Sequence, residues 1–253
     1  MAFKLLDGVT GISCSRAVKL SKAVGVKEHT IFASVKQVGA TAFSAATLVL
    51  QGSYTGADSE TGMITNPTIA IGSTAERFAN AAFTFLIDNT TYSKAVNTTG
   101  TVFSAAHVIG DGASPLWGVV NVYINASGTW LTDVPTSPQI YASAALALAA
   151  ANAMQPRGGY VLVGQILINS DSTTWTANTD DLTNGSDLTT ANFISNRSSF
   201  KDMLTYAFDS DDIANGSAIA TLKSFHVAFA RLYLPVLTGS VQFTGIYEPE
   251  DSP

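Results

Sequence analysis

Three histidines, His29, His107 and His226, are the side chains best suited to acid–base chemistry or metal binding, and each stands alone in the sequence. None has a second ligand at the spacing of a metal site such as HExxH. His226 lies in an alternating apolar stretch and is expected to point away from its apolar neighbours. We therefore expect neither a metal nor a catalytic role at the histidines.

Aspartates gather at two places in the second half of the chain, and carboxylate oxygens are the ligands that Ca²⁺ prefers. An EF-hand loop that began at Asp209 would need glycine at its sixth position and glutamate at its twelfth. These positions hold Ala214 and Ala220. Solvated turns are therefore expected at both clusters, which comprise Asp209, Asp211 and Asp212, and Asp180, Asp181 and Asp187.

Motifs of nucleophilic and phosphate chemistry are missing from the sequence: there is no GxxxxGK loop, no GxGxxG after a strand and no GxSxG elbow. The sequence neither predicts nor excludes a carboxylate pair for glycoside hydrolysis, because such a pair is defined by distance in space. Glutamate is scarce, however. The single cysteine, Cys14, permits no internal disulfide and no cysteine cluster, and is expected to be a small apolar filler in a strand. We expect no enzyme activity and no cofactor.

The aromatic side chains offer a different function, a carbohydrate-binding or host-surface-binding site. Trp117 and Trp130 lie within strand-like runs, so we expect them to pack in the core. Trp175 lies in a long polar stretch, residues 170–196, and is the best candidate for an exposed aromatic contact.

Charge is sparse and unevenly distributed. Charged residues make up 13% of the chain and hydrophobic residues 46%, with a net charge of −6; a typical globular domain has about 25% charged residues. This balance argues against nucleic-acid binding, which needs concentrated Lys and Arg. Residues 1–36 are nevertheless basic, and either orient docking onto an acidic partner or form a solvated face. Their cations are Lys4, Arg16, Lys19, Lys22, Lys27 and Lys36.

No membrane segment is expected. The longest apolar run, residues 142–151, is far short of the roughly 20 residues of a spanning helix. The first residues, Met-Ala-Phe-Lys-Leu-Leu-Asp, lack the apolar stretch of a secretory signal.

Short apolar or alternating runs bounded by Gly, Ser, Asn and Asp predict a mainly β chain, with β-sandwich domains and one helix packed on a sheet. The helix is expected over about 138–155, with Ser137 as N-cap, Pro138 in the first turn, and a stop at Pro156. Its sequence is rich in Ala and Leu. Strands are expected at residues 30–36, 45–51, 68–71, 82–88, 116–124, 129–131, 160–168, 224–234 and 239–247.

The order of these elements over residues 82–182 resembles a module of virion structural proteins from tailed bacteriophages. The likeness is carried by Phe-Leu-Ile-Asp-Asn-Thr-Thr-Tyr-Ser-Lys-Ala at 85–95, Ile-Asn-Ala-Ser-Gly-Thr-Trp at 124–130, the Ala-rich segment 141–154, and Gly-Tyr-Val-Leu-Val-Gly-Gln-Ile-Leu-Ile at 159–168. The similarity lies in the order of the elements and in their general residue composition over about 100 residues, and not in an invariant motif.

The two ends of the chain together resemble a small phage β-sandwich. Leu-Gln-Gly-Ser-Tyr-Thr-Gly at 50–56 matches its turn, and Ala-Arg-Leu-Tyr-Leu at 230–234 matches its late strand. This resemblance implies a discontinuous β-sandwich made of residues 1–75 and 197–253. A β-rich module with the helix, residues 76–196, is then inserted between them.

The resemblance implies a location on the phage particle, after synthesis in the host cytoplasm. It also implies a homo-oligomer, with trimers the common form, that binds capsid or other virion proteins. A capsid decoration or cement protein is the first expectation, with Lys4, Arg16, Lys19, Lys22 and Lys27 facing the shell. A tail, baseplate or head-fibre component is the second, and the host-surface or carbohydrate-binding module is the third.

Overall fold

The computed structural model describes residues 3–11, 13–15, 18–19, 28–38, 40–42, 44–53, 60–171, 173–183, 188–196, 201–208, 218–223, 229–239 and 241–250. Strands hold 51% of the residues and helix 6%. The prediction of a mainly β chain with one Ala-rich helix is therefore confirmed. The β-sandwich arrangement stays a prediction.

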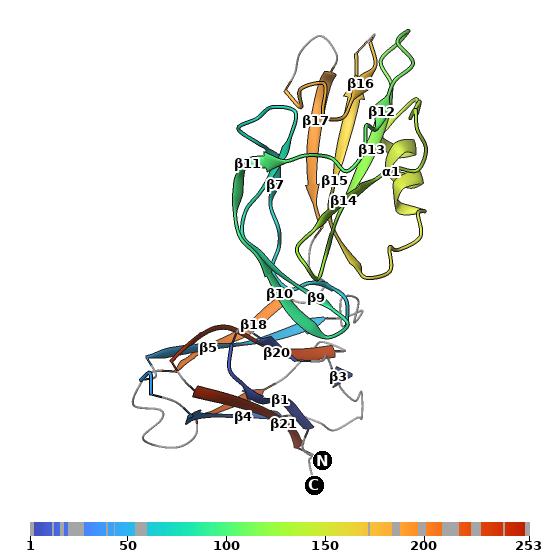
Figure 1. Ribbon diagram of the computed structural model, residues 1–253. Helices are drawn as coiled ribbons and strands as arrows, with labels where there is room; N and C mark the ends of the chain where they lie inside the picture. Colours follow the sequence, from blue (N-terminus) through green and yellow to red (C-terminus); the bar gives the residue numbers. More distant parts are fainter. Residues whose placement is uncertain are drawn as a thin grey trace. The chain divides into compact units, whose positions relative to one another are not determined.

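Two compact units make up the chain (Figure 1). Unit 1 contains Met1–Thr61, Asp88–Thr91 and Ser199–Pro253, and unit 2 contains Gly62–Ile87 and Tyr92–Ser198. Residues 62–75, which were expected in the discontinuous domain, belong instead to unit 2, where Gly62–Met63 and Ile69–Ile71 pair with strands of that unit. The sequence does not mark this domain boundary, because the stretches on both sides of it show the same pattern of short strands.

Unit 1 joins strands from both ends of the chain. One sheet has the order β1-β21-β4-β19, and the other has the order β18-β5-β20-β2 with β3 also paired to β20. Their bounds are β1 Phe3–Val9, β2 Ser13–Cys14, β3 Val18–Lys19, β4 Glu28–Gln37, β5 Ala45–Ser53, β18 Lys201–Phe208, β19 Ala218–Lys223, β20 Phe229–Thr238 and β21 Val241–Glu250.

A buried polar pair ties β5 to β20 inside unit 1. Arg231 and Gln51 are cross-strand partners, and they are 0% and 2% exposed. The Nε of Arg231 donates to the Oε1 of Gln51 over 2.8 Å. A buried guanidinium needs such acceptors because its charge is costly to remove from water.

Unit 2 is built on the antiparallel sheet β14-β13-β15-β17. Smaller sheets have the orders β10-β9-β6, β11-β8-β7 and β12-β16. The bounds are β6 Gly62–Met63, β7 Ile69–Ile71, β8 Phe78–Asn80, β9 Phe83–Ile87, β10 Thr90–Lys94, β11 Asn97–Thr101, β12 Val108–Ile109, β13 Trp117–Asn125, β14 Trp130–Asp133, β15 Tyr160–Ser170, β16 Trp175–Thr176 and β17 Leu188–Ser195.

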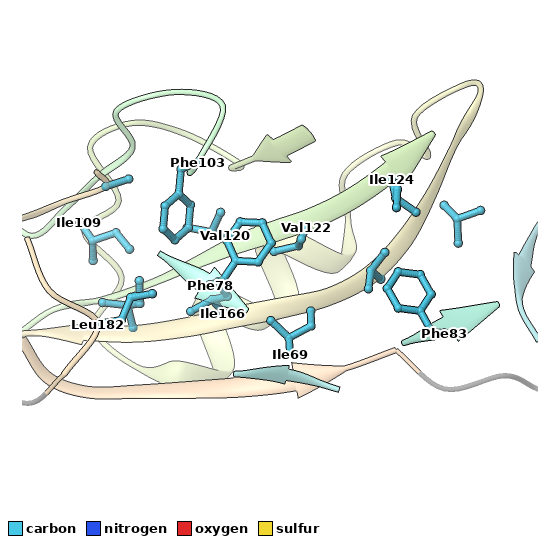
Figure 2. Close-up of a cluster of buried hydrophobic side chains, with 14 of the residues drawn as sticks. Ile69, Phe78, Phe83, Phe103, Ile109, Val120, Val122, Ile124, Ile166 and Leu182 are labelled. Carbon is cyan, nitrogen blue, oxygen red and sulfur yellow. The ribbon is translucent and has the colours of Figure 1, made fainter. Parts of the chain in front are cut away.

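The alternation of side chains along β13 divides unit 2 into layers. Val120, Val122 and Ile124 face an apolar core that also contains Ile69 and Phe78 from the smaller sheets (Figure 2). Val119, on the opposite face of the strand, belongs to a separate cluster with the helix. Successive side chains of a strand point to opposite faces, so one strand serves both layers.

Helix α1 covers Ala144–Asn152 and lies beside β13 (Figure 1). Ser143 is its N-cap, and the Ser143 hydroxyl accepts a hydrogen bond from the Leu146 N–H over 3.3 Å. The predicted start at Ser137 is therefore wrong. Residues 139 and 141 instead make β-bridges to Ile109 and Trp117, because tertiary pairing overrides local helix propensity there.

Candidate interaction surface

The basic segment expected to face a shell is described only in part. Lys4 lies in β1 and Lys19 in β3, while Arg16, Lys22 and Lys27 lie outside the described residues. His226 and the cluster of Asp209, Asp211 and Asp212 also lie outside them, and His29 lies in β4.

Trp175 is fully buried, so the prediction of an exposed aromatic contact is wrong. Its strand β16 pairs with β12, opposite Ile109, which places the indole in the core of unit 2. The ring meets Phe103 edge-on at 5.7 Å between centroids, and its Nε1 donates to the Asp181 carbonyl over 3.0 Å. The polar residues around it close a turn, in which the Asp180 carboxylate accepts from the Thr176 N–H.

His107 is 6% exposed and takes part in a cluster with two hydroxyl groups, those of Thr132 and Ser104. Its Nε2 lies 2.9 Å from the Thr132 Oγ1, and the Ser104 Oγ lies 2.9 Å from that same atom. Burial lowers the pKa of His107, and the nearby Asp133 carboxylate partly opposes this shift. The imidazole therefore contacts the Thr132 hydroxyl directly and the Ser104 hydroxyl only through Thr132, which is itself buried at 3% exposure.

The Ser104 hydroxyl has a structural use at the edge of the main sheet. It accepts from the Thr132 N–H and donates to the Thr132 carbonyl, both over 2.9 Å. A side chain thus takes the place of a neighbouring strand for one residue of edge strand β14. Asn178 does the same for Phe103, whose N–H and carbonyl it binds over 2.8 and 3.0 Å.

Gln139 is a third side chain that takes the place of a neighbouring strand, which we call a cap of the strand edge. This cap also positions the helix. Strand β14 ends opposite Asn121, so the edge of β13 beyond that point needs other partners. The Gln139 Oε1 accepts from the Val119 N–H over 2.9 Å, and its Nε2 donates to the Val119 carbonyl over 3.0 Å. Both residues are 0% exposed. The segment that leads into α1 is therefore held against the sheet by buried bonds.

The inner face of α1 is made of small side chains that let the helix approach the sheet closely. Ala147 and Ala151 pack on Val119 and Leu167 in one buried cluster. At the C-terminal end of the helix, the Asn121 amide donates to the Ala151 carbonyl over 3.3 Å.

A second amide strengthens this anchor. Gln165 of β15 donates to the Asn121 Oδ1 and to the Asn152 Oδ1, over 2.9 and 3.0 Å. The segment before the short helix and the C-terminal end of the helix are thus both tied to the sheet, which keeps the outer face of the helix in place.

The outer face of α1 is apolar although it is exposed. Leu146 is 56% exposed and Ile140, just before the helix, is 57% exposed. Ala145 and Ala149 are exposed on the same helix. We call Ala145, Leu146 and Ala149, which share one side of α1, the helix face. Residues 134–156 contain no charged side chain, and the flanking Asp133 and Arg157 form an ion pair with each other.

The sequence predicts a helix that packs on a sheet, but this exposed surface was not among the predictions. A signal was available, because a helix that is apolar on all sides cannot bury every face against one sheet. Such a face can contribute to protein–protein contact, where buried apolar area is the main favourable term.

Other kinds of site have little support in the described part of the chain. No three His, Cys, Asp or Glu side chains there lie together in a way that could hold a metal ion. None of the described helices is long and apolar enough to cross a membrane. Cys14 is buried, and burial raises the pKa of its thiol to about 11, partly opposed by the charge of Arg231.

Comparisons with protein-family models, with curated proteins and with solved structures each returned no match to this chain.

Proposed function

We propose that the chain is a virion structural protein of a tailed bacteriophage, and specifically a capsid decoration protein that binds and stabilises the head shell as an oligomer. The observation that carries the proposal is the helix face, an uncharged apolar surface held in place by buried hydrogen bonds of Gln139, in the segment before α1, and of Asn121 to the Ala151 carbonyl at the end of α1. The low charge content of the chain and its resemblance to phage virion modules support the same assignment.

Stabilisation of a shell by such a protein is a matter of added interface. Each copy that spans neighbouring capsomers buries surface that must be exposed again before the shell can open. A standard protein interface buries on the order of 1,600 Å². The basic N-terminal segment, with Lys4 in β1 and Lys19 in β3, is the part that we expect to face the shell.

Particles of the source virus provide the test. Mass spectrometry of gradient-purified particles should find the chain, and immunogold labelling should place it on the head. Heads stripped of the protein should rupture at lower temperature and recover when the purified chain is added back. Labelling confined to the tail would reject decoration in favour of a tail or baseplate component, and absence from purified particles would reject the virion role altogether.

A further inference from the structure

We propose that residues 104–107 form a pH-sensitive latch on the edge of β14, which stays closed while His107 is neutral and opens when its imidazole takes up a proton. The latch lies in the connection between β11 and β12, within unit 2. This inference goes beyond the proposed function and does not depend on it, because the device is contained in one copy of the chain.

Polar bonds to a single residue, Thr132, hold the latch against β14. The Ser104 Oγ binds both the N–H and the carbonyl of Thr132, and the Ser104 N–H donates to the Thr132 Oγ1, each over 2.9 Å. The His107 Nε2 lies 2.9 Å from that same oxygen. Ser104, Ala105 and Ala106 are exposed. A segment with so little buried apolar surface opens at a lower free energy than the whole domain unfolds.

A charged imidazole would have no carboxylate in contact with it in the closed latch. The His107 ring is 6% exposed, and it lies edge-on to the Phe103 ring at 6.5 Å between centroids. Its Nε2 faces the hydroxyl of Thr132 and not an acid. A charge that is removed from water without such a partner is costly, and burial accordingly lowers the pKa of His107.

The charged groups on the neighbouring elements leave this cost only partly compensated. Asp133 of β14 opposes the lowering of the His107 pKa, but its carboxylate is paired with Arg157. On the other side, the segment after β16 donates a backbone hydrogen bond to the His107 carbonyl and leads to Asp180 and Asp181. The Asp180 carboxylate accepts a backbone N–H of its own turn, and Asp181 is exposed.

Acid should therefore favour the open latch. In the open state His107 regains its ordinary pKa of 6.5, which is higher than in the closed state, so the open state binds the proton more readily. Between pH 7.5 and 5.5 the opening constant should rise by up to about tenfold, because over this range a free imidazole becomes mostly protonated. Opening frees the N–H and carbonyl of Thr132, and an uncovered edge strand is able to pair with another strand.

Hydrogen exchange of the purified full-length chain, followed by NMR and corrected for the intrinsic rate at each pH, tests the latch. The opening constant at the Thr132 N–H should rise by up to about tenfold from pH 7.5 to 5.5. It should not respond to dilute urea, because local opening exposes little surface. The internal control is the buried N–H of Val119, which is capped by Gln139. It should exchange more slowly and should respond to urea, as expected for global unfolding.

Two variants assign the effect to named side chains. His107→Gln keeps a polar side chain beside Thr132 but cannot take up a proton, so the pH dependence of exchange at Thr132 should disappear. Ser104→Ala changes an exposed residue and should make the Thr132 N–H exchange rapidly at both pH values. The proposal is overturned if the Thr132 N–H exchanges only through global unfolding, with the rate and urea response of Val119. Persistence of the pH dependence in His107→Gln, or slow exchange in Ser104→Ala, would overturn it too.

Discussion

Replacing Gln139 by methionine would remove the polar cap on β13 with little change in side-chain length or volume. The buried N–H and carbonyl of Val119 would each lose their partner. An unpaired buried polar group costs about 1–3 kcal/mol. Two such groups, partly offset by the more favourable burial of an apolar side chain, should lower the free energy of unfolding by about 2–4 kcal/mol.

Urea unfolding followed by tryptophan fluorescence is the appropriate assay. All three tryptophans, Trp117, Trp130 and Trp175, belong to unit 2, so the signal reports on the unit that contains Gln139. With a denaturant slope of about 2 kcal/mol per molar, the midpoint should fall by about 1–2 M. The slope itself should not change.

Gln155→Met is the matched control, because Gln155 is exposed just after the same helix. Its effect should stay within about 0.5 kcal/mol, as for ordinary surface substitutions. If Gln139→Met were as mild as this control, the cap would not contribute to stability, and the account of how α1 is positioned would be refuted.

Three further predictions concern buried groups. Trp175→Ala should destabilise unit 2 by about 3–5 kcal/mol, as expected for a large core side chain; a loss below about 0.5 kcal/mol, measured by urea unfolding followed by circular dichroism, would instead indicate a surface position. Because the pKa of His107 is lower when folded than its ordinary value of 6.5, the unfolded chain binds the proton more readily, so stability should fall as the pH drops below about 6.5. His107→Gln should lose part of this dependence, and identical pH profiles of the two proteins would contradict the prediction. Cys14, with a thiol pKa of about 11, should react with a thiol reagent at pH 8 at least about 100-fold more slowly in the native chain than in urea, because both ionisation and access are suppressed; equal rates would contradict its burial.

Much of the local structure was predictable because it depends on neighbouring residues. Asp88 and Asn89 form the tight turn between β9 and β10 with φ angles of 49° and 63°, a conformation that Asp and Asn adopt more readily than most residues. The Ala-rich segment forms a helix, and Pro156 follows its end. The strong β run at 160–168 lies within β15.

The predictions that the structure corrects concern residues whose position depends on a partner far away in the sequence. Trp175 sits in a polar stretch, but its pairing with Ile109, far away in sequence, carries it into the core. The helix begins later than its sequence suggests, because Gln139 satisfies the backbone of Val119. Neither partner is visible from residue type or spacing.

Composition and short-range periodicity were enough to establish a mainly β chain that is poor in charge and has one Ala-rich helix, because these properties depend on a few neighbouring residues. Which apolar side chains are buried became known only from the packing of distant segments. That packing places Trp175 inside and leaves Leu146 outside, since one sheet can cover only one face of α1. The helix face follows from that geometric limit, and not from any motif.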